Sequence, residues 1–286
     1  MSLPASSIPA ETPIMVAAFY LFTPLADYTA LRVAYKQHMV EAGIKGTILL
    51  APEGINGTIS GGRQEMADFL TFLRNDPRLS ALEHKESFFH THPFGRAKVK
   101  LKKEIISLGV PADPTENAGI YVEPEDWNAL ISAPDMVVVD ARNEYETHLG
   151  TFKGSLDPKT RNFKQLPAYT KKVLDPKKNK RVATFCTGGI RCEKYTAYLL
   201  EQGFEEVYHL RGGILKYLET IPKTESLWEG DCYVFDDRVG VGHELVPSAT
   251  ATNCPSCGHS LLPIDRTQLN SSNGTRCPYC PTEKGA

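Results

Sequence analysis

The chain has 286 residues, of which 41% are hydrophobic and 23% charged, and its formal net charge is −2 at pH 7. This composition predicts a globular protein of about two domains and excludes a disordered or fibrous chain. Nucleic-acid contact would require a local basic patch, and no apolar run reaches the roughly 20 residues that span a bilayer. Seven cysteines, an odd number without a secretory signal, predict a reducing cytoplasm rather than a disulfide framework.

The first domain is expected over residues 14–108, after a disordered tail at residues 1–13. Apolar, β-rich runs predict strands, and apolar residues at helical spacing predict two helices, the first starting at Thr23-Pro24. The order β-α-β-β-α-β predicts a ferredoxin-like (acylphosphatase-like) α+β domain. The first helix is expected to end at Gly43, the second to span Arg63–Arg74, and a turn is expected at Pro52–Gly57. The expected strands are Ile14–Phe22, Lys45–Ala51, Thr58–Ser60, Leu82–His90 and Arg96–Ile106.

The last expected strand of this domain carries four basic residues, here called the basic stripe. Side chains alternate between the two faces of a strand, so its four cations should share one face. Two interpretations remain open, a solvated edge strand guarded by lysine and a surface for an RNA backbone, and the residues alone favour the first. The stripe consists of Arg96, Lys98, Lys100 and Lys102.

Residues 109–119 are rich in proline, glycine and small polar residues and are expected to be a linker. Strand-like and helix-like segments then alternate over residues 120–225, which predicts an α/β domain with a parallel sheet covered on both faces. Residues 226–286 have few apolar runs and cannot build a large core unaided. The expected elements are helices at Pro124–Ile131, at Glu193–Gln202 and from Gly213, and strands at Met136–Val139, Arg181–Phe185 and Glu206–Tyr208.

The strongest candidate site is the loop that follows the strand Arg181–Phe185. It reads Cys186-Thr187-Gly188-Gly189-Ile190-Arg191 and leads into a helix. Glycines let successive backbone N–H groups point into one cup, the helix adds its positive N-terminal end, and arginine adds a cation. Such a cradle lowers a thiol pKa and stabilises a thiolate, a persulfide or an oxyanion. Cys186 and Arg191 are therefore the candidate catalytic residues, and a buried cysteine before a turn is the alternative.

Cys192 starts the helix behind this loop. It is a candidate for the thiol that resolves a persulfide or sulfenate on Cys186. A packed helix-start thiol is the alternative, and the residues favour it.

Two C-x-x-C pairs lie near the end of the chain. Four thiolates in this arrangement suit tetrahedral zinc, and a closed four-cysteine set is structural. Metal binding would also explain how a segment with a small core folds. Reduced or redox-active thiols are the alternative. The expected ligands are Cys254, Cys257, Cys277 and Cys280.

Three blocks resemble rhodanese domains. The loop Cys186–Arg191 is similar to the six-residue rhodanese active-site loop. Related phosphatases have one residue more between cysteine and arginine, so the length of this loop matches rhodanese rather than the phosphatases. The block from Asp140 to Ser155 resembles the upstream rhodanese motif, and Leu210–Ile214 resembles the downstream one. Within the upstream block, Asp140 and Arg142 are expected to form a structural ion pair.

The resemblance extends beyond the rhodanese blocks. Gly54–Gly57, Cys186–Glu193 and Trp228–Arg238 together resemble the TrhO family, over about residues 14–280. One departure is Tyr233, where phenylalanine is more usual. The resemblance implies an oxygen-dependent enzyme that converts the wobble uridine of tRNA to 5-hydroxyuridine, with Cys186 as its active-site cysteine. It implies tRNA as partner, molecular oxygen as co-substrate and an unidentified reductant, and it favours the RNA interpretation of the basic stripe.

Two other functions use the same residues. A sulfurtransferase would carry a persulfide on Cys186 and pass sulfur to tRNA or a protein. A non-catalytic RNA- or protein-binding module would leave the loop idle, and an ordinary thiol pKa would then be expected.

Overall fold

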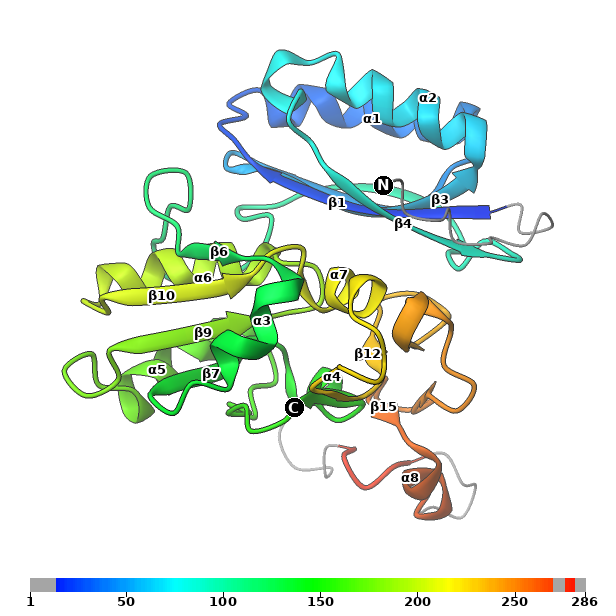
Figure 1. Ribbon diagram of the computed structural model, residues 1–286. Coiled ribbons are helices and arrows are strands. Elements are labelled where there is room, and N and C mark those ends of the chain that lie inside the picture. The colour runs from blue at the N-terminus through cyan, green and yellow to red at the C-terminus, as the bar shows by residue number, and fades with distance from the viewer. Residues whose placement is uncertain (1–13, 270–275, 281–286) are drawn as a thin grey trace, which may run out of the picture. The chain divides into compact units, whose positions relative to one another are not determined.

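The computed structural model describes residues 14–269 and 276–280 (Figure 1). The chain divides into two compact units, one ending at Ile105 and the other beginning at Ile106. Among the described residues, no helix is both long enough and apolar enough to cross a membrane.

The first unit is a five-stranded sheet in the order β4-β1-β3-β2-β5, with β5 parallel to β2 and the other neighbours antiparallel. Helices α1 and α2 cover one face of the sheet (Figure 1). The order 4-1-3-2 of the first four strands is that of a ferredoxin-like fold. The elements are β1 (Ile14–Phe22), α1 (Tyr28–Glu41), β2 (Lys45–Ala51), β3 (Gly54–Gly62), α2 (Arg63–Arg74), η1 (Pro77–Leu79), β4 (His84–Phe89) and β5 (Ala97–Leu101).

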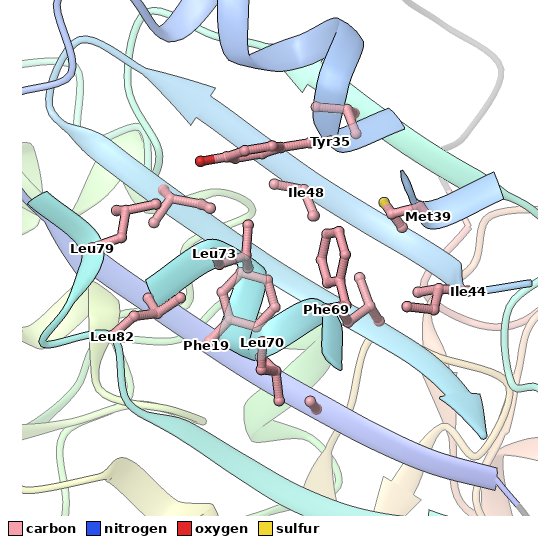
Figure 2. Packing of buried hydrophobic residues seen from close by; sticks show 14 of the residues in the cluster. Phe19, Tyr35, Met39, Ile44, Ile48, Phe69, Leu70, Leu73, Leu79 and Leu82 are labelled. Atoms are coloured by element: carbon pink, nitrogen blue, oxygen red, sulfur yellow. The ribbon is translucent and has the colours of Figure 1, made fainter. Parts of the chain in front are cut away.

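The core of this unit lies between the sheet and its two helices. Helix α2 buries Met66, Phe69, Leu70 and Leu73, which recur at the spacing of one helical face. Figure 2 shows Phe69 and Leu73 packed over the strands beside Phe19, Ile48 and Tyr35. The sequence pattern therefore determines both where α2 forms and which side faces the sheet.

Two local predictions in this unit are wrong. The first helix begins at Tyr28 rather than at Thr23-Pro24, because the backbone N–H groups of Thr23 and Leu25 bond to the carbonyls of Glu53 and Pro52. That pairing holds the segment extended, and Leu25 is fully buried. The expected turn at Pro52–Gly57 shrinks to two residues, since β3 already begins at Gly54, opposite Ala51.

The second unit contains a four-stranded sheet in the order β6-β10-β9-β7, parallel at every pairing. Its two faces carry separate cores, so neighbouring residues of β9 divide between them: Val182 packs in the core that contains α6, and Ala183 in the core that contains α3 and α7. The main elements are β6 (Ile120–Val122), α3 (Pro124–Ile131), β7 (Met136–Asp140), α4 (Glu144–Thr147), β8 (Gly150–Phe152), η2 (Phe163–Gln165), α5 (Leu166–Val173), β9 (Arg181–Phe185), α6 (Ile190–Glu201), β10 (Glu206–Leu210) and α7 (Gly213–Thr220).

Residues 228–261 add five short strands to this unit, paired as β11 with β8, β12 with β13 and β14 with β15. Strand β11 pairs with β8, and Trp228 and Cys232 are buried in the same core as α3 and α7. At the start of the unit, Leu108 is fully buried in the other core, although we placed it in the first domain. The C-terminal elements are β11 (Trp228–Gly230), β12 (Cys232–Tyr233), β13 (Gly240–Val241), η3 (His243–Leu245), β14 (Thr252–Asn253), β15 (Ser260–Leu261) and α8 (Pro263–Thr267).

Candidate active site

The Cys186 loop connects β9 to α6 at the carboxyl end of the parallel sheet, where open α/β sheets bind ligands. The Cys186 side chain is fully buried, and the Gly189 N–H donates to its Sγ at 3.2 Å. Gly189 has φ +106°, a backbone conformation that favours glycine, and Ile190 begins α6. The helix therefore starts three residues earlier than predicted, directly on the loop.

The start of α7 fixes the other side of the loop. The N–H groups of Ile214 and Leu215 donate to the carbonyls of Cys186 and Thr187 at 3.0 and 3.1 Å. A Cβ on Gly213 would lie 2.5 Å from the Cys186 carbonyl oxygen. Glycine at this position therefore permits the close approach that orients the loop.

The pKa of the Cys186 thiol is lowered from 9.0 to about 5. Burial opposes this shift, because it disfavours a charged sulfur. A hydrogen bond from the Cys192 thiol, the positive charge of Arg191 and the backbone N–H groups of Cys192 and Gly189 outweigh the burial. The site thus holds a thiolate at neutral pH, and a thiolate is the nucleophilic form of cysteine.

Glu146, on α4, is a site residue that the sequence analysis missed. Its two carboxylate oxygens accept hydrogen bonds from Nη1 and Nη2 of Arg191 at 2.5 and 2.6 Å, and Glu146 is fully buried. The Thr187 hydroxyl donates to the same carboxylate at 3.3 Å. Arg191 therefore has two interactions in the site: its charge lowers the pKa of Cys186, as the cradle predicts, and its guanidinium is paired with Glu146. The signal was present in the upstream rhodanese-like block, which contains Glu146.

Asp140 and Arg142 form the expected ion pair beneath the site. The Arg142 Nη2–Asp140 Oδ2 distance is 2.6 Å, and both side chains are fully buried. Arg142 also donates to the Gly150 carbonyl at 2.6 Å, and its guanidinium lies 5.0 Å from the Trp228 ring centroid. These contacts tie the upstream block to strand β11, which is a structural role.

Cys192 lies behind the loop on the first turn of α6. It is fully buried, and its Sγ lies 3.9 Å from the Thr184 hydroxyl. Burial and the neighbouring Cys186 raise the pKa of Cys192 well above its ordinary value. The protonated thiol therefore donates to the Cys186 thiolate, and its role as a resolving thiol stays a prediction.

Four cysteines come together in the C-terminal segment. The Sγ atoms of Cys254 and Cys280 are 3.7 Å apart, those of Cys257 and Cys277 are 3.6 Å apart, and all four lie within 4.8 Å of one another. A tetrahedron with Zn–S bonds of ~2.3 Å has edges of about 3.8 Å. The cluster can therefore hold a metal ion, and its spacing fits zinc, which would cross-link the β14–β15 hairpin to residues 276–280.

The basic stripe lies on and beside β5, at one edge of the first unit's sheet. Arg96, Lys100 and Lys102 are exposed, and Lys98 is half-buried. Val99 is buried on the opposite side, as the alternating pattern predicts. The stripe belongs to the first unit and Cys186 to the second, so they are two separate candidate sites.

Comparisons with known proteins identify both domains. The UPF0176 acylphosphatase-like domain matches residues 14–105, and the rhodanese-like domain matches residues 123–220.

Similar solved structures include a rhodanese-like domain from Anabaena sp. (16% identity, 38% of this chain and 78% of that one, TM-score 0.32). A rhodanese-related protein from Thermoplasma volcanium matches at 22% identity, over 35% of this chain and 90% of that one, with a TM-score of 0.29. The polysulfide-sulfur transferase of Wolinella succinogenes matches at 30% identity, over 35% of this chain and 73% of that one, with a TM-score of 0.29. An acylphosphatase-like UPF0176 domain followed by a rhodanese domain is the architecture of the TrhO/UPF0176 family, and this rhodanese-type chain has that architecture.

Proposed function

We propose that the protein hydroxylates C5 of the wobble uridine of tRNA in the cytoplasm, with molecular oxygen as co-substrate and Cys186 as nucleophile. The observation that carries the proposal is the Cys186 thiol, whose pKa of about 5 makes it a thiolate at neutral pH. The TrhO/UPF0176 architecture supports the choice of substrate.

The charges around Cys186 favour an uncharged substrate. Arg191 is paired through both Nη atoms with Glu146, and Arg142 is paired with Asp140. These two ion pairs and the Cys186 thiolate are five charged groups with a net charge of one negative. No unpaired cation is therefore left among them to bind a small sulfur oxyanion. A uracil ring is neutral and electrophilic at C6, which suits an anionic nucleophile.

In the proposed reaction the Cys186 sulfur adds to C6 of uracil, and C5 gains the electron density needed to react with oxygen. One oxygen atom replaces the hydrogen at C5, and the other leaves as water with two electrons and two protons from a reductant. Loss of the C6–S bond then restores the ring and the thiolate. The loop amides and Arg191 lower the free energy of the anionic sulfur at the start and end of this cycle.

Two other parts of the chain would hold the RNA and support the site. The stripe at Arg96–Lys102 would contact phosphates. The four-cysteine cluster would bind structural zinc and fold the C-terminal segment, whose first strand, β11, contacts Arg142 beneath the site through Trp228.

A persulfide-carrying sulfurtransferase is the second candidate, because backbone N–H groups that stabilise a thiolate also stabilise a terminal persulfide sulfur. Mass spectrometry of tRNA nucleosides from a strain that lacks the gene separates the two functions. Loss of 5-hydroxyuridine supports the hydroxylase. Loss of thiolated uridine with intact 5-hydroxyuridine supports the sulfurtransferase and overturns the first proposal.

A further inference from the structure

The β12–β13 hairpin presents an aromatic ring beside the active-site loop. Phe235 lies between the two strands and is 55% exposed. Its ring centroid is 5.9 Å from Cζ of Arg191, within the range of a cation–π contact. Arg191 in turn contributes to the low pKa of Cys186. The exposed ring therefore lies next to the residues that activate the nucleophile.

The hairpin is built to hold this ring in place. The neighbouring Asp236 and Arg238 form a buried ion pair, with Oδ2 and Nη2 2.5 Å apart. The Val234 N–H donates to the Val239 carbonyl at 2.9 Å, which closes the turn. Phe235 meets Tyr233 edge-on, with 5.2 Å between the ring centroids. Both sequence neighbours of Phe235 are thus anchored while the ring itself reaches solvent.

Single exposed apolar side chains are common on protein surfaces. Phe235 differs from an exposed residue such as Val246, because its ring contacts a guanidinium of the site and belongs to an aromatic row. Tyr145, next to Glu146, meets Tyr233 edge-on at 5.3 Å and so links the row to the helix that pairs with Arg191. Phe235 is the solvent-exposed end of this row.

We propose that Phe235 is the stacking platform for the uracil base that reacts with Cys186, a role that rests on the proposed function. RNA-binding proteins recognise bases splayed out of single-stranded loops by stacking them on aromatic rings. Enzymes that modify a base must likewise take it out of its stack. A base on the exposed face of Phe235 would lie beside Arg191 of the loop, and the ring would replace the stacking that the base loses.

Binding of an anticodon stem-loop RNA with uridine at the wobble position tests this role. The full-length chain carries Cys186→Ser, so that no reaction follows binding. Phe235→Ala is expected to weaken affinity by roughly 5- to 100-fold, the usual effect of losing one base–aromatic stack. Phe235→Tyr should retain affinity. Val246→Ala, at a side chain that is 58% exposed, is the matched control and should change nothing.

A second variant reports on stacking directly. Both native tryptophans are buried, Trp127 at 0% and Trp228 at 5% exposure, so Phe235→Trp adds a solvent-exposed fluorophore. Uridine RNA should quench its emission, and the same RNA with an abasic wobble nucleotide should quench it less. Equal quenching by both RNAs, an unchanged affinity of Phe235→Ala, or no RNA binding by the unsubstituted chain each overturns the proposal. If quenching is base-dependent while 5-hydroxyuridine levels do not depend on the gene, the platform stands and the proposed reaction fails.

Discussion

Replacement of Glu146 by glutamine tests whether the site arginine is balanced by this carboxylate. The change keeps the shape of the side chain and removes the charge that accepts from both Nη atoms of Arg191. The Arg191 side chain is 6% exposed, so water cannot replace the lost partner. Breaking a buried pair from one side destabilises by roughly 3–5 kcal/mol. For a unit of this size, each kcal/mol lowers Tm by about 2–4 °C, so we expect a fall on the order of 10 °C.

Thermal unfolding of the full-length chain measures this effect, and Glu144→Gln on the same helix is the matched control. The control should stay within about 1 kcal/mol, since no arginine pairs with Glu144 in the described part of the chain. The freed Arg191 charge should also create a weak oxyanion site. Sulfate should therefore raise Tm of the Glu146→Gln variant and leave the unsubstituted chain unchanged. Equal stability of the two variants, or equal stabilisation by sulfate of variant and parent, would refute the reasoning about charge.

Three further predictions follow from the site, the metal cluster and the stripe. The difference in thiolate absorbance between the parent and Cys186→Ser should persist as pH falls to about 6 and drop to half near pH 5. Because the pKa of Cys186 in the folded chain lies below the unfolded value of 9.0, the stability that this thiolate contributes is complete above pH 9 and is lost as pH falls through 5. A midpoint of the absorbance change near pH 8.5 would contradict the cradle. Metal analysis should find one zinc per chain, and Cys277→Ser should remove it and lower Tm; a full zinc content in the variant would exclude this site. Lys100→Ala should reduce the slope of log affinity for tRNA against log salt by roughly 0.7–0.9, and an unchanged slope would exclude phosphate contact at that residue.

Much of the fold was predictable because its elements have strong local patterns. Strand β9 and helices α2 and α3 begin and end where the sequence placed them. Thr23-Pro24 failed as a helix start because a tertiary pairing with the turn at Pro52 overrides a local capping preference. The local sequence shows the capping residue Thr23, but it does not show the Glu53 carbonyl to which the Thr23 N–H bonds.

The loop of the site and the Asp140–Arg142 ion pair beneath it were predictable, but the residues that contact Arg191 were not. The glycines and the cysteine predict a cradle, because the loop is one continuous segment and its shape depends on residues that are adjacent in the sequence. Glu146 was overlooked because it lies 45 residues from Arg191, and only the fold brings the two together. Phe235 lies within the family-like block Trp228–Arg238, but its exposure beside Arg191 is a property of the folded hairpin.

The most direct test of the account is complementation of a deletion strain with the parent chain or with Cys186→Ser, followed by mass spectrometry of tRNA nucleosides. The parent should restore 5-hydroxyuridine, and the serine variant, expressed at the same level, should restore none. Restoration by Cys186→Ser would show that the thiolate is not the nucleophile of this modification.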